Sequence, residues 1–479
     1  MIIFWGLFEG RDLMQTRPFI QLFKTTSHYY FYDAYVNQIS ELSAAGYQYL
    51  KEHQMIDCFY NEEIAQLYKE GFLHENPILT FQHPATDFVE DLTTRKAGTL
   101  VLQITQNCNL RCSYCPYSQS GEKHRHHTNQ NMSWETAKKA VDFYYDKSID
   151  ADTANISFYG GEPLLQFSLM KAVVAYSKKK FEGKKCVFSI TTNATLLTKE
   201  IADFLITNEF RLAISLDGDK ESNDRNRKFV SQKGSVFEKV IETLQYFYEN
   251  APEFAKKINL SMVIDQRKDL KGFLHLFREY PFLNHMQVSV SLIEDDYLEN
   301  EVKESKAFYE EFSYYRFLSY LSVISPLDFT EDLKFFVSMK ESYKKLVLPF
   351  QASAIGKTAI PSGQCIPGNT KVMVTVQGKL FPCEKVSERR EDYCIGTLDT
   401  GYDYEKIREI LNFSRYTFAL CRNCPAFREC TLCFKTHGAG GFSSTATKMK
   451  YCALCKQNFV EDLRVRMYFK EMADWKGRG

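Results

Sequence analysis

The 479-residue sequence predicts an α/β protein with a central parallel sheet, preceded by a small α+β unit and followed by a cysteine-rich region. From residue 99 onward, short β-branched runs alternate with amphipathic segments, which is typical of β-α-β units with right-handed crossovers. The cysteines gather mainly in two fields, one directly after the first run and one in the last third of the chain. Because a chain of this length exceeds one ordinary core, we expect three domains, at residues 1–95, 96–325 and 326–479.

Charge and composition narrow the classes of partner. Lysine plus arginine and aspartate plus glutamate both number 60, so the balanced charge offers no electrostatic basis for a nucleic-acid or membrane partner. The apolar opening at residues 1–8 lacks a basic segment and is a weak signal-peptide candidate. Fourteen cysteines without an export signal favour metal binding in a reducing compartment, so we expect a cytoplasmic protein.

The first 95 residues contain β-prone runs at 19–23 and 29–32, which predict a hairpin, and helical patterns at 37–53 and 61–75. Together they suggest a winged-helix-like module, which resembles the precursor-recognition domain of many peptide-modifying enzymes. That resemblance implies binding of a leader peptide as an added strand. The alternatives are a module that only packs on the catalytic domain, or one that docks a partner protein. The polar stretch at 83–97 is expected to be a linker.

The second domain is expected to contain six strands that alternate with helices. We place the strands at residues 99–105, 155–159, 186–192, 211–216, 258–264 and 286–292. We place the helices at residues 133–147, 164–180, 198–208, 235–250, 268–280 and 303–321.

Directly after the first strand, Cys108, Cys112 and Cys115 form a CxxxCxxC loop. Three thiolates on one loop suit a [4Fe–4S] cluster and leave one iron open, whereas a zinc knuckle, the alternative, usually takes four ligands. The loop resembles the cluster loop of radical SAM enzymes. The resemblance implies that S-adenosylmethionine chelates the open iron and is cleaved to a 5′-deoxyadenosyl radical. It also implies a partial (β/α)6 TIM-like barrel with its site at the carboxyl ends of the strands.

Gly160, Gly161 and Glu162 follow the second strand. Glycines permit close approach to the backbone, and a carboxylate can accept from an ammonium. The three residues resemble the family's GGE motif, which implies contact with the amino group of the cofactor.

Polar residues near later strand ends are further cofactor candidates. Ser215 resembles a family serine near the ribose, and Asn193 is its suggested companion, with strand capping as the alternative for both. Arg227, with Arg225 as a competitor, suits bidentate pairing with the cofactor carboxylate. Asp217 is a candidate catalytic base.

The second field contains Cys365, Cys383, Cys394, Cys421, Cys424, Cys430, Cys433, Cys452 and Cys455. A hairpin is predicted to deliver Cys383. The spacing resembles the SPASM domain, an auxiliary-cluster module of radical SAM peptide-modifying enzymes, although the interval from Cys430 to Cys433 is one residue short. A zinc ribbon is the alternative for residues 421–433.

The SPASM resemblance implies two auxiliary clusters, and hence three [4Fe–4S] clusters in all. Auxiliary cluster II would take Cys421, Cys424, Cys430 and Cys452. Auxiliary cluster I would take Cys365, Cys383 and Cys433, with Cys394, Cys455 or a substrate thiolate as its fourth ligand. Glu384 stands where sulfatase-maturing relatives carry a proton-removing aspartate, so it is the other candidate base.

Three other features have less specific interpretations. The run of basic and imidazole side chains at residues 123–127 is expected to be a solvated loop or lid, with a metal site as the alternative. The segment at 437–442 is expected to be a flexible turn. The isolated residues Cys58 and Cys186 are expected to be ordinary thiols.

The combined hypothesis is a radical SAM peptide maturase that acts on a ribosomally made precursor bound through its leader, with flavodoxin or ferredoxin as electron donor. A cysteine thioether to carbon is the first expected product, as in sactipeptide and ranthipeptide maturation. Carbon–carbon crosslinking is second and formylglycine formation third. The rival from another class is a non-enzymatic iron–sulfur or zinc protein that binds peptides.

Overall fold

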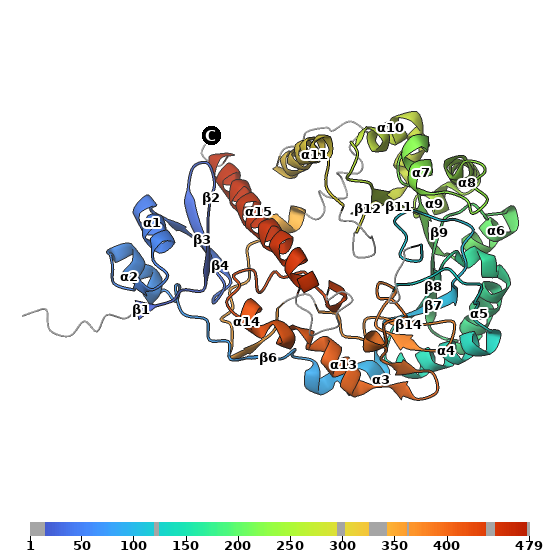
Figure 1. The fold of residues 1–479 in the computed structure, drawn as a ribbon, viewed down its shortest axis with the longest axis horizontal. Helices are drawn as coiled ribbons and strands as arrows, with labels where there is room; N and C mark the ends of the chain where they lie inside the picture. The colour runs from blue at the N-terminus through green and yellow to red at the C-terminus, as the bar shows by residue number, and fades with distance from the viewer. Residues whose placement is uncertain are drawn as a thin grey trace, which may run out of the picture. The chain divides into compact units, whose positions relative to one another are not determined.

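The computed structural model describes residues 15–118, 124–294, 302–324, 343–361, 364–436 and 446–476 (Figure 1). The chain forms two compact units. Unit 1 comprises residues 1–84, 344–364 and 412–479, and unit 2 comprises residues 85–343 and 365–411. The opening at 1–8, Lys123 and the turn at 437–442 lie outside the described residues.

Unit 2 contains the expected parallel sheet. Its six parallel strands occur in the order β12-β11-β10-β9-β8-β7, so each strand lies beside the next one along the chain. The strands are β7 (Thr99–Thr105), β8 (Thr153–Gly160), β9 (Lys185–Thr192), β10 (Arg211–Ser215), β11 (Asn259–Ile264) and β12 (Gln287–Leu292). This arrangement confirms the α/β fold with a partial parallel barrel sheet.

Helices follow the strands and cover one side of the sheet in Figure 1. Several begin at a side chain that accepts a backbone N–H, as Ser133, Thr198 and Ser235 do. The helices are α3 (Val89–Arg95), α4 (Trp134–Lys147), α5 (Phe167–Lys180), α6 (Lys199–Thr207), α7 (Lys220–Asn226), α8 (Val236–Asn250), α9 (Pro252–Ala255), α10 (Lys271–Glu279), α11 (Lys306–Ile324) and α13 (Tyr404–Leu411).

The predicted hairpin after residue 371 extends this sheet. Strand β14 (Val372–Val374) pairs parallel to β7, and β15 (Leu380–Phe381) pairs antiparallel to β14. A second small hairpin follows, formed by β16 (Gly396–Thr397) and β17 (Gly401–Tyr402). Part of the predicted cysteine-rich region therefore continues the central sheet.

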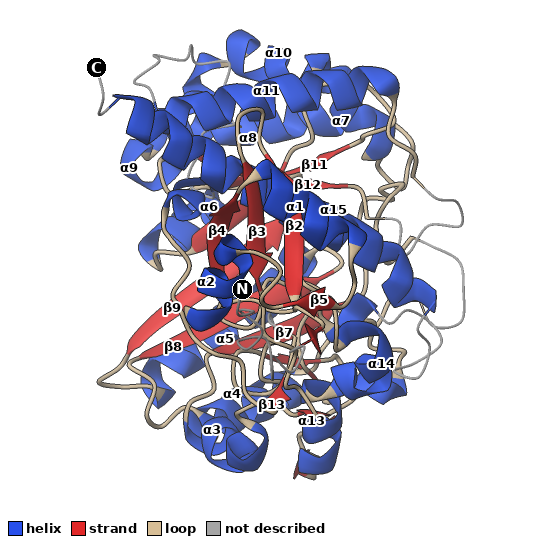
Figure 2. Cartoon of the chain, turned by 90° about the vertical axis from the view of Figure 1, so that its left-hand side faces the viewer, coloured by secondary structure: helices blue, strands red, loops and turns tan. Residues whose placement is uncertain are grey.

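Unit 1 is built on an antiparallel sheet of β2 (Ile20–Lys24), β3 (Tyr29–Asp33) and β4 (Gln38–Leu42). The strands of this sheet contribute to two hydrophobic clusters. In one cluster, Phe31 and Leu42 pack with apolar residues of α1 (Ala44–Glu52) and α2 (Glu62–Lys69). In the other, Phe23 and Tyr30 pack in a cluster that includes residues of the long helix α15 (Ala446–Lys476). Both α15 and the strands are visible in Figure 2.

Unit 1 also contains short elements. They are β1 (Gln15–Thr16), β5 (Ile56–Asp57), β6 (Thr80–Phe81), β13 (Thr358–Ala359) and α14 (Phe418–Cys421). Strand β1 pairs with β5, and β13 pairs with β6.

Three local expectations were wrong. The segment expected as one helix at 37–53 is β4 followed by α1, because Ser43 caps the helix and accepts from the Gly46 N–H. The expected helix at 61–75 ends early, since α2 stops before Gly71, whose φ is +95°. The expected linker at 83–97 contains α3, whose Thr93 is buried and donates to the Val89 carbonyl over 2.7 Å.

Within the residues that the structure describes, no helix is both long enough and apolar enough to cross a bilayer.

Candidate active site

The cysteine loop begins where β7 ends, and backbone hydrogen bonds hold it from two sides. On one side, the N–H groups of Gly161 and Glu162 donate to the carbonyls of Thr105 and Asn107 over 3.0 and 2.8 Å. On the other side, residues 226–230 pair with the loop. Arg111 N donates to Lys228 O over 2.8 Å, and Ser113 N donates to Asn226 O over 2.9 Å. The loop is therefore fixed by the chain itself at the carboxyl end of the sheet.

The paired glycines are required by that close approach. A Cβ on Gly160 would lie 2.0 Å from the Thr105 carbonyl oxygen, and one on Gly161 would lie 2.1 Å from the Asn107 carbonyl oxygen. Gly160 also has a φ of +138°. The sequence argument attributed these glycines to the approach of a ligand, but in the structure it is the cysteine loop's own backbone that approaches them.

Glu162 is buried, with 1% of its surface exposed, and its carboxylate joins two strand ends. It accepts from Leu164 N over 3.0 Å, from Thr192 Oγ1 over 2.7 Å and from Asn193 N over 2.8 Å. Burial raises the pKa of Glu162, whereas the hydrogen bonds from Asn193, Thr192 and Leu164 lower it. The carboxylate thus fixes the end of β9 beside the cysteine loop.

Asn193 contacts the cysteine loop directly. Its Nδ2 donates to Asn109 Oδ1 over 2.9 Å and lies 3.9 Å from Cys108 Sγ, while its Oδ1 accepts from Thr195. Ser215 ends β10 half-buried, and its hydroxyl makes no hydrogen bond to any described residue. Of these two ribose candidates, Ser215 is the one whose polar group is uncommitted within the described part of the chain.

Asp217 and Arg227 form a buried ion pair. Arg227 Nε donates to Asp217 Oδ2 over 2.8 Å, and the two side chains are 8% and 1% exposed. Asp217 also accepts from Val263 N over 2.9 Å and from the Tyr114 hydroxyl of the cysteine loop. Arg227 Nη1 lies 4.0 Å from Cys112 Sγ. Both residues, predicted as a base and as a cofactor clamp, therefore engage each other beside the cysteines; Arg225 instead pairs with Glu221.

The environment of the Cys108 and Cys112 thiols fits metal-bound thiolates. Burial raises the pKa of Cys108 to about 12 and that of Cys112 to about 11, so the free thiols would stay protonated at neutral pH. Yet N–H donors point at these sulfurs: Leu110 N lies 3.4 Å from Cys108 Sγ, in addition to Asn193 and Arg227. Buried sulfur surrounded by N–H donors is stable as thiolate once iron supplies the compensating charge, so the loop fits a [4Fe–4S] cluster.

Sequence reasoning missed the role of Arg125, which it assigned to a solvated loop or lid. Its guanidinium is buried and pairs with Glu388, with the two side chains 3% and 8% exposed. It also donates to the Tyr159 hydroxyl over 3.1 Å, and Gln103 of β7 donates to Glu388 over 2.8 Å. The one sequence feature that could have indicated a role for Arg125 is its position in a short basic run, ten residues after Cys115. The pair joins the segment that follows the cysteine loop to residues after the β15 hairpin.

Cys365, Cys383 and Cys394 of the second field belong to unit 2. Cys365 is exposed, and the Cys394 thiol donates to the Gly396 carbonyl over 3.3 Å. Glu384, next to Cys383, pairs with Lys371 over 2.7 Å and is 20% exposed.

The remaining cysteines of the field belong to unit 1 and make contacts among themselves. Cys424 is close enough to Cys421 and Cys452 for their charges to interact. Cys455, expected to be a spare thiol, hydrogen-bonds with Cys430, which lowers the pKa of Cys455, and its sulfur lies 3.8 Å from Thr431 Oγ1. Five of these thiols thus make contacts in two groups, with Cys421, Cys424 and Cys452 in one and Cys430 and Cys455 in the other. The assignment of four of them to auxiliary cluster II stays a prediction, as does the grouping of Cys433 with Cys365 and Cys383.

Comparison with known proteins agrees with this arrangement. Residues 102–277, which span β7 to α10, match the model of the radical SAM superfamily. These residues belong to that superfamily. The match includes the cysteine loop and the residues around it.

Proteins similar to this chain include anaerobic sulfatase-maturating enzymes. The cysteine-type enzyme of Clostridium novyi is 23% identical over 78% of this chain and 97% of its own. The serine-type enzyme of Bacteroides thetaiotaomicron is 30% identical over 31% of this chain and 35% of its own. This chain spans about half or less of the length of the first curated relatives that it matches.

Solved structures show the same fold. The structure of native anSMEcpe with bound AdoMet and the Cp18Cys peptide superposes with a TM-score of 0.53 and 19% identity, over 77% of this chain and 99% of that one. The likeness supports the radical SAM fold.

Proposed function

We propose that this protein is a radical SAM peptide maturase that installs cysteine thioether crosslinks to carbon in a ribosomally made precursor. The observation that carries the proposal is the cysteine loop itself. Cys108, Cys112 and Cys115 are held by the chain at the carboxyl ends of parallel strands, and Cys430 and Cys455 of the second cysteine field contact each other. Neither a zinc protein nor a simple peptide binder requires this combination.

The site residues would divide the task of holding the cofactors. When bound, S-adenosylmethionine and its cluster supply a carbon radical that takes a hydrogen atom, and the auxiliary clusters supply an acceptor for the remaining electron. Asn193 and Arg227 direct N–H groups at Cys108 and Cys112 and would favour their thiolate form. Ser215 offers a free hydroxyl to a ribose. Glu162 fixes the loops between which the cofactor would lie.

In thioether formation one S–H and one C–H bond break and one S–C bond forms, with loss of two hydrogens. One leaves as the hydrogen atom taken from carbon, and the other leaves as a proton and an electron. Glu384, which pairs with Lys371, is the proposed proton acceptor. The thioether assignment is supported by a separate N-terminal sheet, β2–β4, which is suited to binding a leader as an added strand.

Formylglycine formation is the second candidate function. It is favoured by the relation to sulfatase-maturating enzymes along nearly their whole length. The electron demand is the same, but the substrate cysteine would lose its sulfur instead of keeping it in a crosslink. Product analysis therefore separates the two candidates.

The first test is anaerobic incubation of reconstituted protein with S-adenosylmethionine and dithionite. We expect 5′-deoxyadenosine, and its absence from fully iron-loaded protein would overturn the proposal. The second test is intact-mass analysis of a co-expressed precursor encoded beside this gene. Thioether formation predicts a loss of two hydrogens per crosslink and fewer alkylatable thiols, whereas sulfur loss would indicate formylglycine.

A further inference from the structure

Arg125 is a buried cation at the point where three segments of unit 2 meet. Its Nη1 donates to the Tyr159 hydroxyl over 3.1 Å, and its Nη2 donates to the Val386 carbonyl. Its guanidinium lies 5.2 Å from the centre of the Tyr117 ring. Because these groups hold it from separate segments, the charge of Arg125 has a fixed position.

Glu388 is the counterion of Arg125, and its carboxylate is fixed as well. Arg125 Nε lies 2.5 Å from Glu388 Oε2, and the two side chains are 3% and 8% exposed. The other carboxylate oxygen, Oε1, accepts from Gln103 Nε2 over 2.8 Å and from Gln106 Nε2 over 3.4 Å. Solvent therefore screens the two charges little, and the pair acts as a fixed dipole.

The positive end of this dipole faces the cysteine loop. Tyr117 comes two residues after Cys115, so the ring beside the guanidinium follows directly on the loop. Burial raises the pKa of Tyr117, and Arg125 lowers this pKa by more than Glu388 raises it. Burial also raises the pKa of the Cys115 thiol, whereas a hydrogen bond from the Tyr117 N–H and the charge of Arg125 lower it. Arg125 thus favours negative charge on Cys115.

The same arrangement occurs at Cys112. Arg227 Nη1 lies 4.0 Å from Cys112 Sγ, while its Nε donates to Asp217 Oδ2 over 2.8 Å. Both ion pairs are buried, and each has its guanidinium toward a cysteine of the loop. A buried ion pair adds little stability over apolar residues of the same size. Two pairs in one orientation therefore indicate that their charge serves the cluster site.

We propose that the pair of Arg125 and Glu388 sets the reduction potential of the [4Fe–4S] cluster at the cysteine loop. Reduction adds one electron, and hence one negative charge, when the cluster passes from [4Fe–4S]²⁺ to [4Fe–4S]⁺. A fixed positive charge beside Cys115 stabilises the reduced form and raises the potential, because local charge and burial tune such clusters. Arg125 is a positioning residue that acts through Cys115, and the inference is independent of which product the enzyme forms.

The test is a potentiometric titration of the full-length reconstituted protein with dithionite, followed by electron paramagnetic resonance. The signal that changes on addition of S-adenosylmethionine identifies the cysteine-loop cluster. Arg125→Gln should make this cluster about tenfold harder to reduce, which lowers its potential by about 59 mV for one electron. Glu388→Gln should raise the potential, because it leaves the guanidinium charge uncompensated. Opposite shifts distinguish a role of charge from a role in packing, since disturbed packing has no reason to follow the sign of the lost charge.

A double variant removes the charges and keeps the site filled. Arg125→Met combined with Glu388→Met replaces the pair by apolar side chains, a change that buried ion pairs often tolerate. Its potential should be lower than that of the wild type, by less than in Arg125→Gln.

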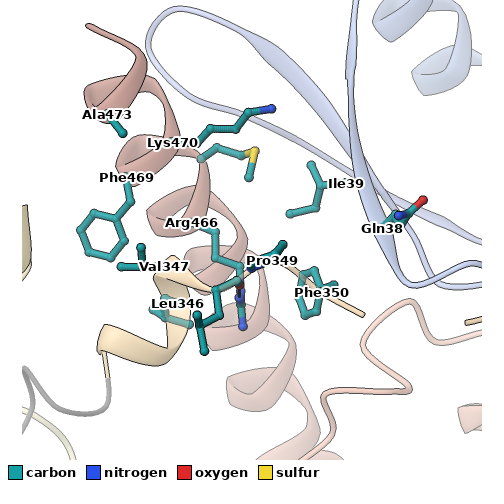
Figure 3. Close-up of a pocket in the computed structure, with 12 residues that line it drawn as sticks. Gln38, Ile39, Leu346, Val347, Pro349, Phe350, Arg466, Phe469, Lys470 and Ala473 are labelled. Atoms are coloured by element: carbon teal, nitrogen blue, oxygen red, sulfur yellow. Dashed lines mark hydrogen bonds between the residues drawn. The ribbon is translucent and has the colours of Figure 1, made fainter. Parts of the chain in front are cut away.

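Arg466→Gln is the matched control, because Arg466 of unit 1 is also a stacked guanidinium. It lies 4.2 Å from the centre of the Phe350 ring and donates to the Leu348 carbonyl over 2.7 Å, in the groove that Figure 3 shows. This variant should leave the potential of the cysteine-loop cluster unchanged.

Shifts of the same sign in Arg125→Gln and Glu388→Gln, or an unchanged potential in either variant, would overturn the proposal. A potential at or above the wild-type value in the double variant would do the same, as would an equal shift in Arg466→Gln. If one of the Gln variants does not fold, the sign of the shift in the other and in the double variant decides. Iron content is measured in the same samples, so that potentials are compared at equal loading.

Discussion

The two cysteine regions of this protein are held in different ways. The loop of Cys108, Cys112 and Cys115 follows a buried parallel strand and is bonded by backbone groups on both sides. The cysteines of unit 1 lie instead in short turns after α14 and near the start of α15. Around residues 421–433, the backbone hydrogen bonds mostly join residues a few positions apart.

The difference indicates which site the chain forms without iron. A loop bonded to the ends of strands keeps its shape because those strands are part of the core. The turns around residues 421–433 are closed by local backbone bonds and depend on side-chain contacts for their links to the rest of unit 1, such as the bonds from Arg428 to the Ala34 and Tyr35 carbonyls. A bound cluster would supply part of their order. We therefore expect the radical SAM site to be preorganised and the unit 1 site to depend on metal.

The largest effect is expected from the cysteine loop. Replacing Cys108, Cys112 and Cys115 by alanine should abolish 5′-deoxyadenosine formation and remove about four irons per chain, as expected for one cluster. Circular dichroism should remain unchanged, because the loop is held by its backbone. If the triple variant failed to fold, the preorganised character of this site would be refuted.

Gly161→Ala should lower the rate of 5′-deoxyadenosine formation by about 100-fold. A Cβ at this position would lie 2.1 Å from the Asn107 carbonyl oxygen, so the cysteine loop would have to move. A displacement of about 1 Å can lower a catalytic rate by about 100-fold. The rate should be compared with that of Gly356→Ala, whose Cβ would meet nothing closer than 3.7 Å. Equal rates for the two variants would mean that the loop tolerates displacement.

Glu388→Gln should destabilise the fold by about 3 kcal/mol, because it leaves the buried Arg125 charge without its counterion. The thermal unfolding midpoint measures this effect. Glu391→Gln removes an exposed partner of Lys379, where the side chains are 68% and 36% exposed, and should change stability by less than about 1 kcal/mol. Similar midpoints for both variants would show that the Arg125 pair does not stabilise the fold.

Removal of iron should affect the two regions unequally. After anaerobic chelation, we expect amide hydrogen exchange to increase about tenfold at residues 418–436, because locally bonded turns open at low free-energy cost. Residues 99–118 should change little. Equal increases in both regions would contradict the contrast between them.

The smallest effect is expected from Cys455→Ser. Because Cys455 contacts Cys430, its loss should change the electron paramagnetic resonance signal of an auxiliary cluster while leaving 5′-deoxyadenosine formation within about twofold. Cys186→Ser alters an isolated thiol on β9 and is the matched control. An unchanged signal in Cys455→Ser would return that residue to the role of a spare thiol.

Much of the fold followed from local pattern. The strand and helix bounds of unit 2 were predicted to within a few residues, because alternating β-branched and amphipathic segments directly reflect burial. The prediction of one helix at 37–53 was wrong for a related reason. The spacing of its apolar residues suits a helix, but residues 38–42 form a strand that pairs with β3. Long-range pairing of that kind leaves little trace in a single segment.

By itself, the sequence predicted the chemistry of the site, since three thiols after a strand and a Gly-Gly-Glu at the next strand end are particular residue types at a characteristic spacing. Only the tertiary structure decided the partners of those residues. Arg227 faces Asp217, Glu162 joins two strand ends, and Arg125 is buried against Glu388. Such pairings depend on which distant segments meet in space, and a charged side chain has the same letter in the sequence whether it is solvated or buried.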